Sequence, residues 1–127
     1  MKTPVEVVTE YWRRMQTNDF RSAGEMLSDD FTLDWPQSGE RIRGRENFAK
    51  VNEEYPASGT WHFTVHRIIG DGEVAVSDVS LTDGVIQARA ITFSTVRDGR
   101  IVRQTEFWPD AMPAQENRKH LVERIES

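Results

Sequence analysis

The sequence predicts one α+β domain, in which a curved and mostly antiparallel sheet wraps around three N-terminal helices. Two observations predict this architecture. Apolar residues recur at three- and four-residue spacing before Pro56, and at every second position from Trp61 to Trp108. Three glycine-containing breaks divide the second part into consecutive strands, as expected for hairpins. A strongly twisted sheet over helices leaves a cone-shaped cavity, and cavities of this kind hold ligands.

Three helices are expected before the main part of the sheet. The first has Thr3 as a candidate N-cap and Pro4 as its first helical residue. Its apolar stripe is Val5, Val8, Trp12 and Met15. A second, short helix is expected to end near Ser28. The third is expected to begin at Gly44 and to stop before Pro56, with Phe48, Val51 and Tyr55 on one face.

Five strands are expected, one before the third helix and four after it. Residues 31–35 alternate apolar and polar side chains and are closed by Pro36. The other four are expected at residues 61–65, 74–79, 85–96 and 101–108. Residues 113–126 are expected to form a helical tail. Because there is no repeat or linker, residues 1–127 are expected to form a single domain.

The composition excludes several classes of function. The chain has 127 residues, of which 37% are hydrophobic and 29% charged, and these are ordinary globular values. Its net charge of −5 disfavours binding to nucleic acid or anionic lipid. The chain has no cysteine, signal pattern or long apolar run. We therefore expect a cytoplasmic protein with no cofactor and no nucleic-acid or membrane partner.

The last hairpin predicts which residues share a face of the sheet. If Asp98-Gly99 is a two-residue turn, the ladder places Phe93 opposite Gln104 and Ile91 opposite Glu106. The face with the composition of a pocket then carries Arg89, Ile91, Phe93, Thr95, Val102, Gln104, Glu106 and Trp108. The other face carries the small residues Ala88, Ala90, Thr92 and Ser94. Small side chains would let a second sheet approach, so this second face is expected to form a homodimer.

Glu106 is the residue most suited to chemistry. A carboxylate between an indole and apolar neighbours is desolvated, which raises its pKa toward the range useful for proton transfer. In the alternative interpretation, Glu106 forms a structural ion pair with Arg89 or Arg103, or its face is a solvated dimer rim. His62 and His66 could approach a metal, but no third ligand at a suitable spacing accompanies them, so no metal site is assigned.

Three segments resemble a known family. They are TNDFRSAGEMLSDDFTLDWP, GERIRGRENF and the hairpin VRDGRIVRQTEFWPD. With these segments, nearly the whole chain resembles the nuclear transport factor two-like superfamily, in its SnoaL-like branch of polyketide cyclases and ketosteroid isomerases. The resemblance implies a cone-shaped, cystatin-like α+β barrel with a deep hydrophobic pocket. It also implies a homodimer packed through the sheet, and an acid/base carboxylate in the active members.

The resemblance extends to single residues, but only in part. Tyr11 falls where the isomerases keep an oxyanion-hole tyrosine. Trp35 occupies the place of the isomerase general base, and Ile91 or Thr92 that of its protonated aspartic acid, so steroid isomerisation is not expected. Glu106 stands where the cyclases have their acid/base aspartate, and Thr92 lies near the position of their histidine.

These observations predict a cofactor-independent acid/base enzyme acting on a small apolar carbonyl or ring substrate. The expected catalytic residues are Glu106, Tyr11 and Asp34, although Asp34 can serve only if a bulge turns it toward the pocket. The expected ligand-binding residues are Trp12, Trp35, Arg89, Phe93, Gln104 and Trp108. Two alternatives remain: a non-catalytic ligand-binding module and a dimeric scaffold.

Overall fold

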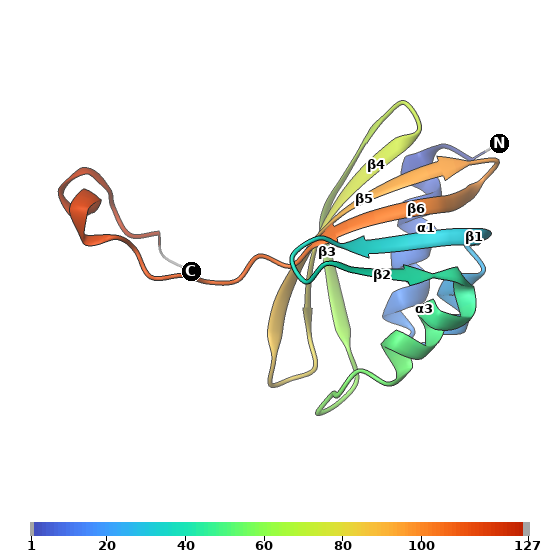
Figure 1. The fold of residues 1–127 in the computed structure, drawn as a ribbon, viewed down its shortest axis with the longest axis horizontal. Coiled ribbons are helices and arrows are strands. Elements are labelled where there is room, and N and C mark those ends of the chain that lie inside the picture. The colour runs from blue at the N-terminus through green and yellow to red at the C-terminus, as the bar shows by residue number, and fades with distance from the viewer. Residues whose placement is uncertain (1, 126–127) are drawn as a thin grey trace.

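The computed structural model describes residues 2–125 and has the predicted α+β architecture. Its elements are α1 (Pro4–Gln16), α2 (Phe20–Gly24), β1 (Leu27–Trp35), β2 (Glu40–Arg43), α3 (Gly44–Glu53), β3 (His62–Asp71), β4 (Val74–Thr82), β5 (Gln87–Arg97), β6 (Arg100–Phe107) and a 3₁₀ helix (Glu116–Leu121). The six strands form one sheet in the order β2-β1-β6-β5-β4-β3. Only β1 and β6 pair in parallel. The sheet is curved and unclosed, and the helices lie on one side of it (Figure 1).

Helix α1 begins with a capping box, as its sequence predicts. The Thr3 hydroxyl accepts a hydrogen bond from the Glu6 backbone N–H at 3.2 Å, and the Glu6 carboxylate accepts one from the Thr3 N–H at 2.9 Å. The buried side of the helix consists of Val7, Val8, Tyr11, Trp12 and Met15. It packs against β3, β4, β5 and β6, whereas α3 packs against β1 and β2. The two helices therefore cover different parts of the same sheet face.

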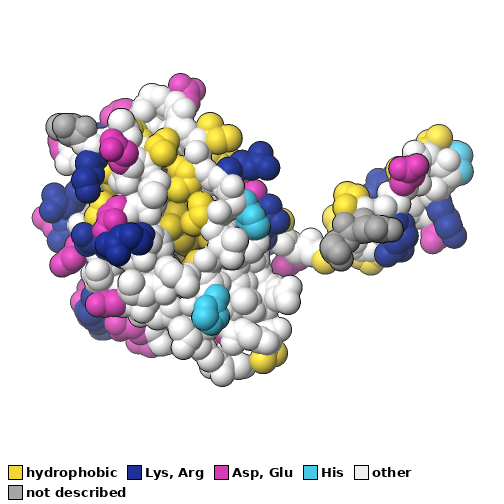
Figure 2. All heavy atoms as spheres, turned by 180° about the vertical axis from the view of Figure 1, so that it is seen from behind, with side chains coloured by type: hydrophobic (Ala, Val, Ile, Leu, Met, Phe, Trp, Pro, Cys, Tyr) yellow, Lys and Arg dark blue, Asp and Glu magenta, His cyan; other side chains and the backbone are white. Residues whose placement is uncertain are grey.

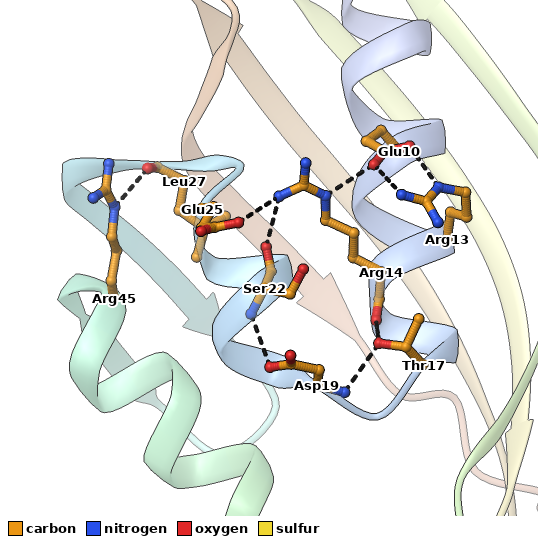
Figure 3. Close-up of polar contacts among 9 residues, drawn as sticks. All are labelled: Glu10, Arg13, Arg14, Thr17, Asp19, Ser22, Glu25, Leu27 and Arg45. Atoms are coloured by element: carbon orange, nitrogen blue, oxygen red, sulfur yellow. Dashed lines mark hydrogen bonds and ion pairs between the residues drawn. The ribbon is translucent and has the colours of Figure 1, made fainter.

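Polar contacts hold the helices in place around the start of β1 (Figure 3). The Arg14 guanidinium donates to the Ser22 carbonyl oxygen at 3.0 Å and to the Glu25 carboxylate at 2.9 Å, which ties α1 to α2. Arg45 of α3 donates from Nε to the Leu27 carbonyl oxygen at 2.8 Å. These bonds fix the relative positions of the three helices on the concave side of the sheet.

The first hairpin differs from the prediction. Strand β2 was not among the five strands expected from the sequence, and it pairs antiparallel with the end of β1. Its pattern Glu-Arg-Ile-Arg has only one apolar residue, Ile42, so a four-residue edge strand is hardly distinguishable from a loop. Strand β1 also begins four residues earlier than expected, at Leu27.

The β5–β6 hairpin confirms the predicted turn but not the predicted register. Asp98 and Gly99 have φ values of 52° and 76°, as a type I′ turn requires. Val96 pairs with Ile101, but Thr95 then pairs with Arg103, so β6 contains one extra residue at this point. Beyond this bulge, the predicted pairing between β5 and β6 was wrong by one residue.

Because of this shift, the β5 residues that share a face with Glu106 are those that were expected on the opposite face. Glu106 lies opposite Thr92, and Gln104 lies opposite Ser94. The small residues of β5 that were expected to face a second sheet instead lie on the inner face; Ala90, Thr92 and Ser94 are fully buried. The sequence-based argument for a dimer through these small residues is therefore wrong.

The C-terminal tail stands apart from the rest of the molecule (Figures 1 and 2). The helix predicted over residues 113–126 is reduced to the six-residue 3₁₀ helix, and residue 126 lies outside the described residues. Residues 109–125 are exposed throughout, including the apolar side chains of Met112, Leu121, Val122 and Ile125. A helix needs an apolar stripe packed on a partner surface, and no such contact forms here. Among residues 2–125, no helix is long and apolar enough to cross a membrane.

Candidate functional site

A cavity of about 490 Å³ lies between the inner face of the sheet and the helices. Side chains from α1, α2, α3, β1 and the ends of several other strands line it. Its aromatic lining is Tyr11, Trp12, Phe20, Trp35, Phe48, Tyr55, Trp61, Phe63 and Trp108. All four tryptophans of the chain are in this set. A concave, largely apolar site of this size is suited to a small organic molecule.

Glu106 of β6 is an ionisable side chain inside this cavity. It is only 5% exposed. One carboxylate oxygen accepts a hydrogen bond from Trp35 Nε1 at 2.9 Å, and the other accepts one from the Thr92 hydroxyl at 2.6 Å. Both donors are neutral, so the carboxylate is oriented by two hydrogen bonds without an opposite charge beside it.

Burial raises the pKa of Glu106 above its usual value of 4.5, and the hydrogen bonds from Thr92 and Trp35 only partly oppose this effect. Among the described residues, Glu106 forms no ion pair with Arg89 or Arg103, in contrast to the alternative interpretation. Arg89 contacts Asp78 instead, at 2.5 and 2.8 Å, and Arg103 is exposed on the outer face.

Tyr11 lines the same cavity from α1. Burial raises the pKa of its hydroxyl well above 10.0, and the nearby Glu106 carboxylate raises it further, while the Gln104 amide opposes both. The hydroxyl is therefore protonated at neutral pH and available as a hydrogen-bond donor. Gln104 itself is fully buried on the inner face, where its Nε2 donates to the Ser94 hydroxyl at 3.2 Å, and it is not among the lining residues.

Asp34 lies on the outer face of β1, away from the cavity. Strand alternation turns it outward because Leu33 and Trp35 line the cavity. The register irregularity of β1 comes before Thr32, too early to reorient Asp34. Its carboxylate accepts two hydrogen bonds from Arg41, at 2.6 and 2.9 Å, and this contact lowers the pKa of Asp34. The structure therefore does not bring Asp34 together with Glu106.

Phe93 and Arg89 are also on the outer face, which corrects their expected place in the pocket. Phe93 is 43% exposed, and its ring packs edge-on against Phe107 with centroids 6.3 Å apart. The cause is the bulge in β6: without the extra residue at Val102, Phe93 would share a face with Glu106. Of the other expected lining residues, Trp12, Trp35 and Trp108 do line the cavity.

The mouth of the cavity includes residues from four separate loops. They are Gln37 and Ser38 after β1, Tyr55 after α3, Ile86 before β5, and Trp108 and Asp110 after β6. The Gln37 side chain accepts a hydrogen bond from the Trp108 backbone N–H at 2.5 Å and donates to the Trp108 carbonyl oxygen at 3.1 Å. This pair of bonds joins the β1–β2 turn to the end of β6.

Sequence reasoning did not assign Phe48, Tyr55 or Trp61 to the site. Phe48 and Tyr55 were expected on one face of the third helix, but α3 ends at Glu53 and Tyr55 follows it. Only the fold shows that both residues border the cavity. Among the described residues, no three His, Asp or Glu side chains are close enough together to hold a metal ion. The His66 ring lies 2.7 Å from the Ser80 hydroxyl.

Comparisons with known proteins agree with this fold. Residues 8–104 match the SnoaL-like domain family. A candidate ketosteroid isomerase from Kribbella flavida is 35% identical, with a TM-score of 0.86 over 95% of this chain and 88% of that chain. An NTF2-like protein of unknown function from Burkholderia xenovorans is 29% identical, with a TM-score of 0.78 over 95% of this chain and 94% of that chain.

A more distant structure has the same fold. IdmH, a candidate polyketide cyclase from Streptomyces antibioticus, is 19% identical, with a TM-score of 0.72 over 84% of this chain and 92% of that chain. The comparison with curated proteins finds no match. From the family match and the similarity to the Kribbella flavida protein, the chain belongs to the SnoaL-like domain family of the NTF2-like superfamily.

Proposed function

We propose that the protein is a cofactor-independent enzyme in which Glu106 moves a proton on a small, largely apolar carbonyl or ring substrate. The observation that carries this proposal is the environment of Glu106. Its carboxylate is buried in an aromatic cavity, held by two neutral donors, and has no cationic partner among residues 2–125. A raised pKa makes the ionised carboxylate a stronger base than an exposed glutamate.

The reaction begins with transfer of a proton from a carbon next to the substrate carbonyl to a Glu106 oxygen. The electron pair of the broken C–H bond moves onto the carbonyl oxygen and forms an enolate. The Tyr11 hydroxyl donates a hydrogen bond to this oxygen as its charge develops. Protonated Glu106 then returns the proton to carbon, so the carboxylate is regenerated.

Two neighbours of Glu106 have a positioning role. Trp35 and Thr92 each donate to a different carboxylate oxygen, which fixes the plane of the carboxylate and leaves one lone pair of each oxygen for the substrate proton. Family membership supports the same type of chemistry, since the 35% identical protein is named for the isomerases. The name of that protein does not identify the substrate of this chain.

The proposal is tested by proton exchange, which needs no knowledge of the final product. Cyclic ketones that fit a 490 Å³ cavity are incubated with the protein in D₂O, and loss of their α-proton signals is followed by NMR. The wild type is expected to accelerate exchange, and Glu106→Gln to slow it by about 10²–10⁴-fold, the usual contribution of a general base.

Asp34→Asn is the matched control, because it removes a carboxylate from the outer face. It is expected to leave exchange unchanged. If Glu106→Gln exchanges as fast as the wild type, Glu106 is not the base. If the wild type binds these ketones without exchanging them, the non-catalytic binding alternative replaces the enzyme.

We also propose that two copies associate through the outer face of the sheet. This is not the small-residue face expected from the sequence. The outer face carries a row of paired residues, Ile69, Val76 and Phe93, and the exposed ring of Phe107 beside them. Exposed apolar side chains that lie together on one face of a sheet favour burial against a second apolar surface.

A further inference from the structure

The ionisable side chains of Asp, Glu, Lys, Arg and His type that line the cavity are all acidic. Two carboxylates line it, Glu106 inside and Asp110 at the mouth, whereas none of the 16 Lys and Arg side chains and none of the three His side chains does. Among the described residues, the cavity therefore offers no cationic partner for a carboxylate, sulfonate or phosphate group. A negatively charged ligand would meet like charge at both positions.

Two arginines that are close in sequence to lining residues are engaged elsewhere. Arg41 binds Asp34 on the outer face of β1, and Arg14 binds Glu10 and Glu25 on the helices. These carboxylates hold the guanidinium groups outside the cavity and neutralise them there. Neither guanidinium group forms an ion pair with Glu106, whose carboxylate accepts hydrogen bonds from the neutral groups of Trp35 and Thr92.

The aromatic lining adds a second feature that favours positive charge. Nine aromatic side chains surround the cavity, and several pack at an angle to one another rather than in parallel. The Trp12 and Phe63 centroids are 5.8 Å apart with planes at 47°, and those of Tyr55 and Trp61 are 5.9 Å apart at 66°. A cation over the face of an aromatic ring is attracted by the ring quadrupole, and rings set at different angles give an ammonium group more than one direction from which to approach a ring face.

We infer that the substrate carries a positively charged amine, and that the cavity selects organic cations over neutral and anionic molecules of the same shape. The inference rests on the proposed function, because it names the substrate class of the same cavity. The ammonium group contacts aromatic rings, and ionised Glu106 supplies the opposite charge. A cation next to the reacting carbonyl would also stabilise the enolate that forms when Glu106 removes the proton.

The inference predicts a particular pH dependence of binding. The titratable groups that line the cavity together with Glu106 are Tyr11 of α1, Tyr55 after α3 and Asp110 after β6. Since Glu106 attracts a cation only when it is ionised, the affinity for a cation should rise as the pH rises through the pKa of Glu106. The affinity for a neutral molecule of the same shape should not rise with it.

Three probes of matched shape test this selectivity: phenyltrimethylammonium, tert-butylbenzene and benzenesulfonate. All four tryptophans line the cavity, so tryptophan fluorescence reports occupancy, with calorimetry as a second measurement. At pH values above the pKa of Glu106, the cation is expected to bind at least about tenfold more tightly than the neutral probe. The sulfonate is expected to bind more weakly than both.

Two variants separate the charge of Glu106 from the net charge of the protein. Glu106→Gln is expected to reduce the advantage of the cation over the neutral probe to less than about threefold, the part left to the aromatic rings. Glu116→Gln removes a carboxylate from the tail and should leave the advantage unchanged. Circular dichroism confirms that both variants are folded.

The outcomes distinguish this inference from the proposed function. If tert-butylbenzene binds as tightly as the cation, or if the advantage of the cation survives in Glu106→Gln, the inference is overturned, while the cavity and the proton-exchange assay stand. If none of the three probes binds, both the inference and a small-molecule role for the cavity are contradicted.

Discussion

Asp34 and Glu106 are carboxylates on the neighbouring strands β1 and β6, but they lie on opposite faces of the sheet. Asp34 faces outward, where Arg41 lowers its pKa. Glu106 faces the cavity, where burial raises its pKa and only neutral groups donate to it. A single step along a strand changes the face, and with it the charge environment. The comparison shows that the face of the sheet, rather than the residue type, decides which carboxylate is suited to proton transfer.

The difference between the two faces should be largest in the free energy of unfolding that is lost when a side chain is truncated. Phe31 is fully buried on the inner face, where its ring lies edge-on to Phe48, whereas Phe107 is 36% exposed on the outer face. Phe31→Ala is expected to lower the free energy of unfolding by about 3–5 kcal/mol because it leaves a hole in the core. Phe107→Ala should cost less than about 1.5 kcal/mol. Urea denaturation measures both, and equal losses would contradict the assignment of faces.

The pH dependence of stability should have opposite signs for the two carboxylates. The raised pKa of Glu106 means that the folded state holds its proton above pH 4.5, where the unfolded chain has released it. Stability is therefore lost as the pH rises through the folded pKa of Glu106. Glu106→Gln should become more stable relative to the wild type as the pH increases in this range.

Asp34 should behave in the reverse way. Its pKa is lowered below 3.8, so the contact with Arg41 stabilises the protein above that pH and is lost as the pH falls through the folded pKa of Asp34. Asp34→Asn should therefore lose stability relative to the wild type as the pH rises through this acidic range. Denaturation midpoints measured from acid to neutral pH would show the two trends, and parallel trends would refute them.

The smallest effect on the stability of the folded chain is expected at the exposed apolar row of the outer face. Phe93→Lys should change the free energy of unfolding of the monomer by about 1 kcal/mol or less, because the ring is already 43% exposed. It should nevertheless shift the proposed dimer toward monomer, as measured by sedimentation. Gln115→Lys, which adds the same type of charge to the tail, is the control. If the wild type sediments only as a monomer, the proposed dimer is contradicted.

Much of the fold could be predicted because local signals agreed with one another. The Thr3-Pro4 start of α1, the glycine at the start of α3 and the Asp98-Gly99 turn each specify backbone geometry that few other residues provide. These signals placed the starts of α1 and α3 and the turn between β5 and β6. Strand β2 was missed since its single apolar residue does not produce a pattern.

The site was only partly predictable, and the bulge in β6 explains why. No special residue marks the irregularity between Ile101 and Arg103, yet it decides whether Phe93 or Thr92 stands beside Glu106. The lining from α3 was missed for another reason. Periodicity identifies the apolar face of a helix, but it does not show whether that face meets packed side chains or a cavity.

The Gln37 side chain has a consequence for the shape of the mouth. A primary amide carries the same donor and acceptor as a peptide group, and here both groups bond to the Trp108 backbone just as an adjacent strand residue would. The side chain thus acts as a substitute for one more residue of sheet where β6 ends. The width of the opening on this side is consequently set by the reach of one glutamine, so that a longer or shorter side chain at position 37 would resize the opening while the strands remain where they are.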